Sequence, residues 1–346
     1  MSDSILKAIE VQSQACASLG APFSAGLLDC AKTDLASGGI TSELLDPWTG
    51  APIEGIVRDA VALRLLASLH YLVLSGRAPE LAVRYPPNGI DPDDAWSTAR
   101  IAFATNRKTV ADFLTHEPQT NEVRRAACML GGFMTIAHAT RFPLRCFELG
   151  ASAGLNSLWD KFLYRIDEQA WGNPNSAVVL SCRWTGTAPR LDPTLAVAER
   201  RACDRKPVDI RQPDQAIRLM SYCWAEQHER IERLRSAIAL ATDFRMEVDA
   251  QEASQWVAQA APEKGMSTTV FHSLVWQYMP PHEQAEVSAI LLSHASRATP
   301  SAPFAWLRME LEEAAKQFQL RLTMWPSGEE RLLAVVHPHG EFAVWS

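Results

Sequence analysis

The stretch at 147–156, which reads FELGASAGLN, constrains the fold more than any other part of the chain. The apolar run at 144–149 predicts a buried strand, and the spacing of apolar residues at 155–165 predicts a helix that follows it. Between them, two glycines permit a tight turn and close packing of the helix on the strand. A strand that ends in the acid Glu148 and continues through Gly-x-Ser-x-Gly into a helix brings bare main chain close to a ligand.

The chain changes in texture at this strand. Ahead of Pro143 there is helical spacing and no convincing strand, with helices predicted at 58–74, 91–114 and 120–139. Beyond it, predicted strands alternate with predicted helices, which indicates a mainly parallel sheet. The strands are expected at 144–149, 177–184, 197–204, 244–250, 268–276, 303–309, 320–325 and 331–337, and the helices at 155–165, 214–241, 251–260, 282–296 and 311–318.

This pattern predicts an α/β chain in two domains. An all-helical cap domain is expected at 1–141, and an α/β domain at 142–346 with an inserted hairpin near 167–195. The last two predicted strands follow one another around Ser327-Gly328, so we expect them to pair antiparallel.

Composition narrows the expected partners. With a formal net charge of -7, the chain has no general basic field for nucleic acid or an anionic membrane. The seven cysteines are odd in number and lack Cys-x-x-Cys spacing, which indicates the reduced thiols of a cytoplasmic protein. We find no signal pattern and no apolar run near the ~18 residues of a membrane span. We expect a cytoplasmic protein with a small-molecule substrate, no metal, no nucleic acid and no membrane.

Two chemistries use a turn of this kind. Main-chain N–H groups at a helix start can hold a carboxylate, and an acid such as Glu148 suits cations, so the turn fits S-adenosylmethionine, which carries a carboxylate, an ammonium and a sulfonium. The same letters satisfy the nucleophile elbow of α/β-hydrolases, with Ser152 as nucleophile and His337 or His339 later in the chain. That elbow follows several earlier strands, whereas this strand is the first, so topology favours a methyltransferase over a serine hydrolase. A non-catalytic ligand-binding protein stays open as a third interpretation.

Several motifs along the chain resemble one known family. They are Glu148-Leu149-Gly150-Ala151-Ser152-Ala153-Gly154-Leu155-Asn156, Gln119-Thr120-Asn121-Glu122, Cys203-Asp204-Arg205-Lys206-Pro207-Val208-Asp209, Phe271-His272-Ser273-Leu274-Val275-Trp276 with Tyr278, and His339-Gly340 with Trp345. Over nearly its whole length the chain resembles a bacterial family of uncharacterised conserved proteins related to the class I S-adenosylmethionine-dependent methyltransferases. The resemblance implies a Rossmann-like methyltransferase sheet, mainly parallel with an antiparallel last strand, and no particular substrate.

The resemblance also implies which residues meet the cofactor, S-adenosylmethionine. In the turn they are Glu148, Gly150, Ala151, Ser152, Gly154 and Asn156. Asp204 would hold the ribose hydroxyls, although it lies about 50 residues beyond the turn where ~20 is usual; pairing with Arg201 or Arg205 is the alternative. Asp249, followed by Ala250, would meet the adenine amino group, and a solvated strand end is the alternative.

On the acceptor side, the resemblance points to the strand at 268–276. His272 interrupts this apolar strand and is expected to act as general base, with a buried, hydrogen-bonded histidine as the alternative. Residues expected near the acceptor are Ser273, Trp276, Tyr278, Asn121 and His339. Glu310, after the strand at 303–309, fits a solvated cap and a pocket acid equally well. The predicted function is methyl transfer from S-adenosylmethionine to an unidentified small-molecule acceptor, and the oligomeric state is left open.

Overall fold

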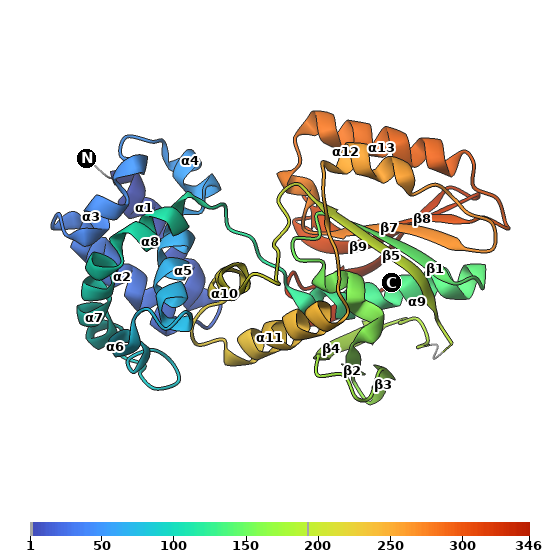
Figure 1. The fold of residues 1–346 in the computed structure, drawn as a ribbon. Helices are drawn as coiled ribbons and strands as arrows, with labels where there is room; N and C mark the ends of the chain where they lie inside the picture. The colour runs from blue at the N-terminus through green and yellow to red at the C-terminus, as the bar shows by residue number, and fades with distance from the viewer. Residues whose placement is uncertain (1–2, 192–193) are drawn as a thin grey trace. The chain divides into compact units, whose positions relative to one another are not determined.

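The computed structural model describes residues 3–191 and 194–346, a mixed α/β chain that divides into two compact units (Figure 1). The first unit comprises Met1–Thr120 and Ile210–Glu232, and the second Asn121–Asp209 and Arg233–Ser346. Of the predicted domain and hairpin ranges, residues 1, 2, 192 and 193 lie outside the described residues. The first unit therefore draws on two separate stretches of chain, because a segment beyond residue 209 joins the helices that precede residue 120.

Within its described residues, the first unit contains helices joined by loops and no strand. Its elements are α1 Asp3–Ser18, α2 Pro22–Ala36, α3 Ile40–Leu44, η1 Asp46–Trp48, α4 Ile53–Arg58, α5 Val61–Leu74, α6 Pro79–Ala82, α7 Pro92–Thr105, α8 Arg107–Thr115 and α10 Pro213–Ser221, and α11 His228–Asp243 begins in it. Eleven of the fourteen residues of α5 are buried, so this helix is central to the apolar core. The run predicted at 91–114 forms two helices, α7 and α8, that meet at Asn106.

The second unit contains the sheet and the helices that cover it. Its elements are η2 Val123–Arg125, α9 Ala126–Thr140, β1 Leu144–Leu149, η3 Leu155–Lys161, β2 Leu163–Ile166, β3 Gln169–Gly172, β4 Val179–Gly186, β5 Val197–Asp204, β6 Asp249–Ala250, α12 Ala253–Trp256, η4 Val257–Gln259, β7 Ser267–Ser273, η5 Trp276–Tyr278, α13 Pro281–Ala295, β8 Phe304–Glu312, β9 Gln317–Trp325, β10 Glu329–Val336 and β11 Phe342–Trp345. Within the described ranges no strand precedes β1, as the sequence predicts.

Five adjacent strands pair parallel to one another, in the order β6-β5-β1-β7-β8. If these five strands are numbered by their order along the chain, the sheet order is 3-2-1-4-5. This is the order of a Rossmann-like sheet. Phe271 of β7 packs edge-on against Phe133 of α9, whereas the neighbouring Val270 belongs to the apolar cluster formed with α12 and α13. The helices thus cover both faces, with α12 and α13 on one side and α9 on the other (Figure 1).

Beyond β8 the sheet departs from the prediction of a single antiparallel last strand. β9 is antiparallel to both β8 and β10, and β11 is antiparallel to β10. β4 then pairs parallel to β11 and β2, and the β2–β3 hairpin ends the sheet. The segment between β1 and β5 therefore extends the far edge of the same sheet, which has eleven strands in the described residues.

Besides the run at 91–114, the helices predicted at 155–165, 214–241 and 311–318 are wrong in extent or kind. The helix predicted at 155–165 is the seven-residue 3-10 helix η3, followed directly by β2. The helix predicted at 214–241 is broken into α10 and α11. The helix predicted at 311–318 does not form, because its apolar residues Leu311 and Phe318 pair across the β8–β9 hairpin. Among the described residues, no helix has both the length and the apolar character that a membrane crossing requires.

Candidate functional site

The site lies at the carboxyl ends of β1 and β7, the neighbouring strands at which the chain order of the sheet reverses. Open α/β sheets bind ligands in the crevice outside the strand ends at this reversal point. The turn that leaves β1 has positive φ angles at Gly150, Ser152 and Gly154, of 63°, 55° and 72°. The chain therefore bends sharply as soon as it leaves the central strand.

Close packing explains why two of these positions are glycine. A Cβ atom on Gly150 would lie 2.1 Å from Cγ2 of Val275, in the loop that follows β7. A Cβ atom on Gly154 would lie 2.8 Å from Cγ2 of Val248, just ahead of β6. Both distances are too short for any real side chain, so the turn is packed between the loop after β7 and the segment ahead of β6.

Asp204, predicted to hold ribose hydroxyls, fastens the turn to the end of β5. Its Oδ2 accepts the main-chain N–H of Ser152 at 2.8 Å, and its Oδ1 accepts the N–H of Lys206 at 2.8 Å. The N–H of Val208 also donates to the carbonyl of Ser152, at 3.1 Å. A carboxylate can accept about four hydrogen bonds, so these two main-chain donors leave acceptor capacity on Asp204.

Asp249 is likewise engaged within the protein. Its Oδ2 forms an ion pair with Arg201 at 2.8 Å and accepts the indole N–H of Trp256 at 2.6 Å. Ala250 is exposed and aligns with Asp204 across β5 and β6. The sequence offered Arg201 as an ion-pair partner for Asp204, but in the structure Arg201 pairs with Asp249.

Glu148 is a buried acid without a basic partner. Its side chain accepts a hydrogen bond from the Ser157 hydroxyl, and no Lys or Arg of the described chain lies within ion-pair distance of it. Burial raises the pKa of Glu148 to about 8, and the negative charge of Asp204 acts in the same direction. At neutral pH this carboxyl therefore carries its proton for most of the time.

Two polar atoms of the turn are buried without a hydrogen-bond partner in the described chain. They are Oγ of Ser152 and Oδ1 of Asn156, in residues that are 7% and 3% exposed. Asn156 uses its other amide atom, Nδ2, to donate to the Glu122 carbonyl at 3.2 Å. Ser152 thus has no histidine paired with its hydroxyl, as an activated nucleophile would.

Motifs that are distant in the sequence meet beside the turn. Oδ1 of Asn121 accepts the main-chain N–H of Leu155 at 3.2 Å. His339 belongs to the loop between β10 and β11, and its Nδ1 lies 3.8 Å from Oε2 of the buried Glu122. Asn121 and His339, both predicted near the acceptor, therefore flank the residues that follow the turn.

The end of β7 holds a closed polar cluster around His272, which is fully buried. Nδ1 of His272 lies 2.6 Å from Oε1 of Glu310, and Nε2 accepts the indole N–H of Trp306 at 3.0 Å. Trp276 stacks on the imidazole with ring centroids 5.2 Å apart. Both ring nitrogens are occupied in this arrangement, so the assignment of His272 as general base stays a prediction.

The remaining predicted residues lie just beyond this cluster. The carbonyl of Ser273 accepts a hydrogen bond from Arg125 at 3.4 Å, and Tyr278 is 74% exposed. Sequence reasoning missed Ser157 and Val275, and left Glu310 undecided. The signal for Glu310 was its place after a predicted central strand, but no local pattern identifies Ser157 or Val275 as neighbours of the turn.

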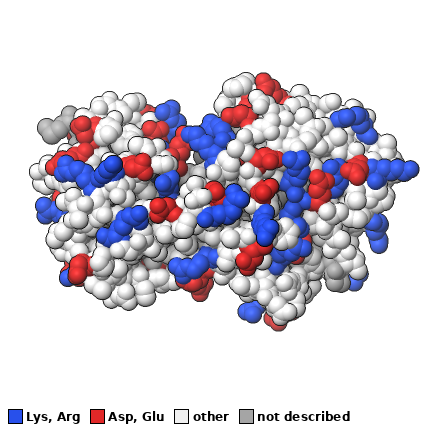
Figure 2. Space-filling view, in the orientation of Figure 1, with Lys and Arg blue, Asp and Glu red and all other residues white. Residues whose placement is uncertain are grey.

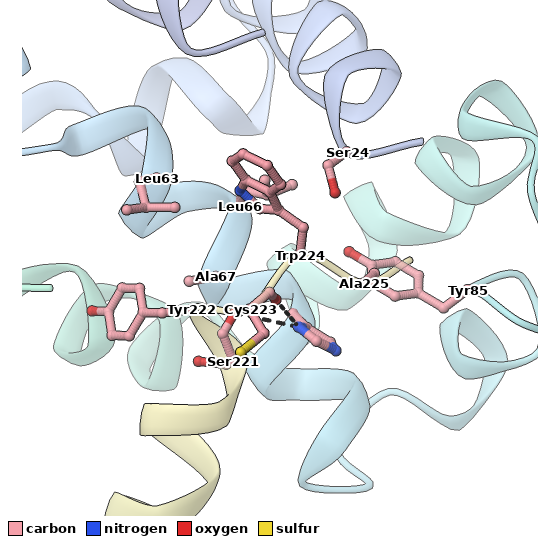
Figure 3. Close-up of a pocket in the computed structure, with 11 residues that line it drawn as sticks. Ser24, Leu63, Leu66, Ala67, Tyr85, Ser221, Tyr222, Cys223, Trp224 and Ala225 are labelled. Carbon is pink, nitrogen blue, oxygen red and sulfur yellow. Dashed lines mark hydrogen bonds between the residues drawn. The ribbon is translucent and has the colours of Figure 1, made fainter. Parts of the chain in front are cut away.

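A separate cavity lies in the helical unit (Figure 3). Its volume is about 10 Å³, room for about one water molecule, whereas small-molecule sites span roughly 300–1,000 Å³. His70 contributes to its wall and donates from Nδ1 to the carbonyl of Cys223, at 2.9 Å. The hydroxyl of Tyr85 is buried there without a hydrogen-bond partner in the described chain. The volume is too small for a nucleoside-sized ligand.

Charges of both signs are interspersed on the face shown in Figure 2. Two arginines of β1 and β5 are paired with acids: Arg200 with Asp160 at 2.8 Å, and Arg145 with Glu199 at 2.6 Å. These pairs neutralise much of the positive charge carried by β1 and β5.

Comparison with known proteins gives one family. Neither the curated proteins nor the solved structures returned a match. The profile of a family described as an uncharacterized protein conserved in bacteria (DUF2332) matches residues 7–345, which is nearly the whole chain. The chain therefore belongs to this conserved bacterial family, DUF2332.

Proposed function

We propose that this protein is an S-adenosylmethionine-dependent methyltransferase whose cofactor lies against the turn between β1 and η3. One observation carries the proposal: a glycine turn leaves the central parallel strand where the sheet order reverses, and it holds polar atoms that have no hydrogen-bond partner among the described residues. The acceptor we propose is a small molecule.

The chemistry of the turn fits this cofactor. Oγ of Ser152 and Oδ1 of Asn156 need partners that a nucleoside or amino-acid group can supply. Glu148 lacks a nearby cation, and the cofactor carries two positive groups. Asp204 retains lone pairs that can accept ribose hydroxyls while it holds the turn. When bound, the cofactor supplies an electrophilic methyl group on its sulfonium.

Two features limit what the residues contribute. Because η3 is a short 3-10 helix, the turn lacks the helix start that was expected to hold a carboxylate. Because both nitrogens of His272 are engaged, this side chain offers no free lone pair to an acceptor proton. The protein therefore contributes mainly positioning and exclusion of water.

A matched pair of serine variants tests the proposal. Ser152→Ala removes the unpaired hydroxyl at the turn, and Ser267→Ala removes another buried, unpaired hydroxyl at the opposite end of β7. We expect wild-type protein to bind S-adenosylmethionine and its demethylated product in calorimetry. Ser152→Ala should weaken binding roughly two- to tenfold, the value of one net hydrogen bond, while Ser267→Ala binds like wild type.

Absence of both heat and thermal stabilisation in the wild type would refute the proposal. Equal affinities for the two serine variants would remove Ser152 from the site. A serine hydrolase is the second candidate, because Ser152 has a positive φ like the residue at a strained elbow. A fluorophosphonate probe would then label Ser152, whereas the methyltransferase proposal predicts no adduct. Cofactor binding without turnover on any pool of small acceptors would indicate a non-catalytic protein.

A further inference from the structure

The pair formed by His272 and Glu310 has a fixed hydrogen-bond direction. An indole N–H can only donate, so Trp306 requires that Nε2 of His272 carry a lone pair. The proton of the neutral ring must then sit on Nδ1, where it is donated to Oε1 of Glu310 at 2.6 Å. Glu310 therefore serves as acceptor for a histidine that is itself fully buried.

The same oxygen of Glu310 also holds the loop that follows β7. Oε1 accepts the main-chain N–H of Val275 at 3.1 Å. Just before it, Leu274 has a positive φ of 53°, and its N–H donates to the carbonyl of Met309, the neighbour of Glu310 on β8. The end of β8 thus fixes two consecutive residues of the loop in a conformation that an unrestrained chain would rarely adopt.

The loop, in turn, touches the glycine turn. Cγ2 of Val275 occupies the space that a Cβ on Gly150 would need, 2.1 Å away. On the other side, the N–H of Ala151 donates to the carbonyl of Cys203 at 2.9 Å. A shift of Val275 would therefore free one wall of the turn while the β5 wall stays in place.

We propose that Glu310 is a positioning residue, which acts with His272 through Val275 to set the shape of the ligand-binding turn at Gly150. In this role it acts through Val275 and not on the reacting groups. The inference rests on the proposed function only for its effect on ligand affinity, because the contacts from β8 through the loop to the turn exist without ligand.

The test compares three variants on β8. Glu310→Ala removes the acceptor for both donors, and Glu310→Gln keeps an acceptor oxygen at the same length. Glu312→Ala is the control, because Glu312 lies two residues further along the same strand and its side chain is 42% exposed. Its Oε2 is 3.9 Å from Nε of its ion-pair partner, Arg321. Hydrogen exchange without ligand, followed by mass spectrometry, is measured for peptides covering 147–156 and 273–279.

Glu310→Ala should speed exchange in both peptides by about tenfold, since it removes the acceptor of two hydrogen bonds that hold the loop. Glu310→Gln should remain within about threefold of wild type, because the neutral amide oxygen accepts the same two donors less strongly. Glu312→Ala should leave both peptides unchanged. Near wild-type exchange in Glu310→Gln would show that the hydrogen-bond acceptor positions the loop. A general loss of packing would not be restored by an acceptor oxygen.

Unchanged exchange at 147–156 in Glu310→Ala would overturn the proposal. If Glu310→Ala does not fold, Val275→Ala is tested in its place, because it leaves Glu310 and His272 intact. Exchange at 147–156 should then be faster than in wild type. Unchanged exchange there would overturn the proposal. The affinity for S-adenosylmethionine should follow the same order, weakest in Glu310→Ala. If wild type binds no S-adenosylmethionine while the exchange pattern holds, the proposed function fails and the positioning role stands.

Discussion

The contact between Gly150 and Val275 can be tested by exchanging the sizes of the two residues. Gly150→Ala places a Cβ at a position 2.1 Å from Cγ2 of Val275, in a backbone with φ of 63°. We expect the positive φ to cost about 1–2 kcal/mol and the overlap about 1–3 kcal/mol, which together give about 2–5 kcal/mol of destabilisation. Val275→Ala in the same chain removes the methyl at 2.1 Å but keeps the Cβ at 2.8 Å, so it should recover most, and not all, of the second part.

The control separates the two costs. Gly265→Ala has a φ of 80° and no atom within 4 Å of the added Cβ, so it should lose only the 1–2 kcal/mol or so of backbone strain. Hydrogen exchange of amides in β1 and β7 is the assay, because it reports the free energy of opening of the sheet. The expected coupling energy between Gly150→Ala and Val275→Ala is about 1–3 kcal/mol in favour of the double variant.

Additive effects would refute this reasoning. A coupling energy within about 0.5 kcal/mol of zero would mean that Val275 does not occupy the space beside Gly150. Equal losses in Gly150→Ala and Gly265→Ala would point to the same conclusion, because strain alone would then explain both. Either result would also remove the structural link between the β7 loop and the turn.

Three further predictions concern buried polar groups. The pKa of Glu148 is raised from 4.5 to about 8. Between these two pH values the folded state keeps a proton that the unfolded state releases. The free energy of unfolding should therefore fall as pH rises from 4.5 to about 8, by at most about 1.4 kcal/mol per pH unit. Urea titrations from pH 5 to 8 should show this slope in wild type and a flatter one in Glu148→Gln. Burial lowers the pKa of His70 from 6.5 to about 4, so stability of the helical unit should be full above pH 6.5 and decline as pH falls toward 4; His70→Gln should lack that decline. Trp306→Phe removes the donor to Nε2 of His272 and should cost about 1 kcal/mol in urea unfolding; an unchanged midpoint would contradict the hydrogen bond.

Strong local patterns predicted much of the fold correctly. The strand at 197–204 is β5 to the residue, and the glycine turn follows the first strand of the sheet, as its sequence indicates. The helix at 311–318 failed because its two apolar ends, seven residues apart, satisfy a helical face as well as a hairpin pair. The helix at 155–165 failed because apolar residues on a buried 3-10 helix and strand mimic helical spacing. The extension of the sheet by β11 and β4 depends on parallel pairing between residues far apart in sequence, which no local pattern encodes.

The site was predictable as a place but not as a set of contacts. Position near the carboxyl end of a strand was enough to bring Glu148, Asp204 and His272 to one edge of the sheet. Their partners could not be foreseen, because Ser152 and Asp204 are 52 residues apart and His272 and Glu310 are 38 apart. Each partner is set by the register of neighbouring strands, and register is a property of the whole sheet.

The hydrogen-bond partners of the residues at the turn, and the atoms there without a partner in the described chain, support a ligand at the turn. A buried hydroxyl without a partner is weak support by itself, since Ser267 on β7 has one as well. Ser267, however, lies in a continuous strand beside Leu144, whereas Ser152 lies in a bent main chain next to an acid without a cation. A turn that served only to connect β1 to η3 would gain nothing from a buried carboxyl held protonated, since an apolar side chain would fill that position at lower cost. The combination is explained if Glu148 and the unpaired atoms are completed by a molecule that brings positive charge and hydrogen-bonding groups, and calorimetry on the serine pair decides whether S-adenosylmethionine is that molecule.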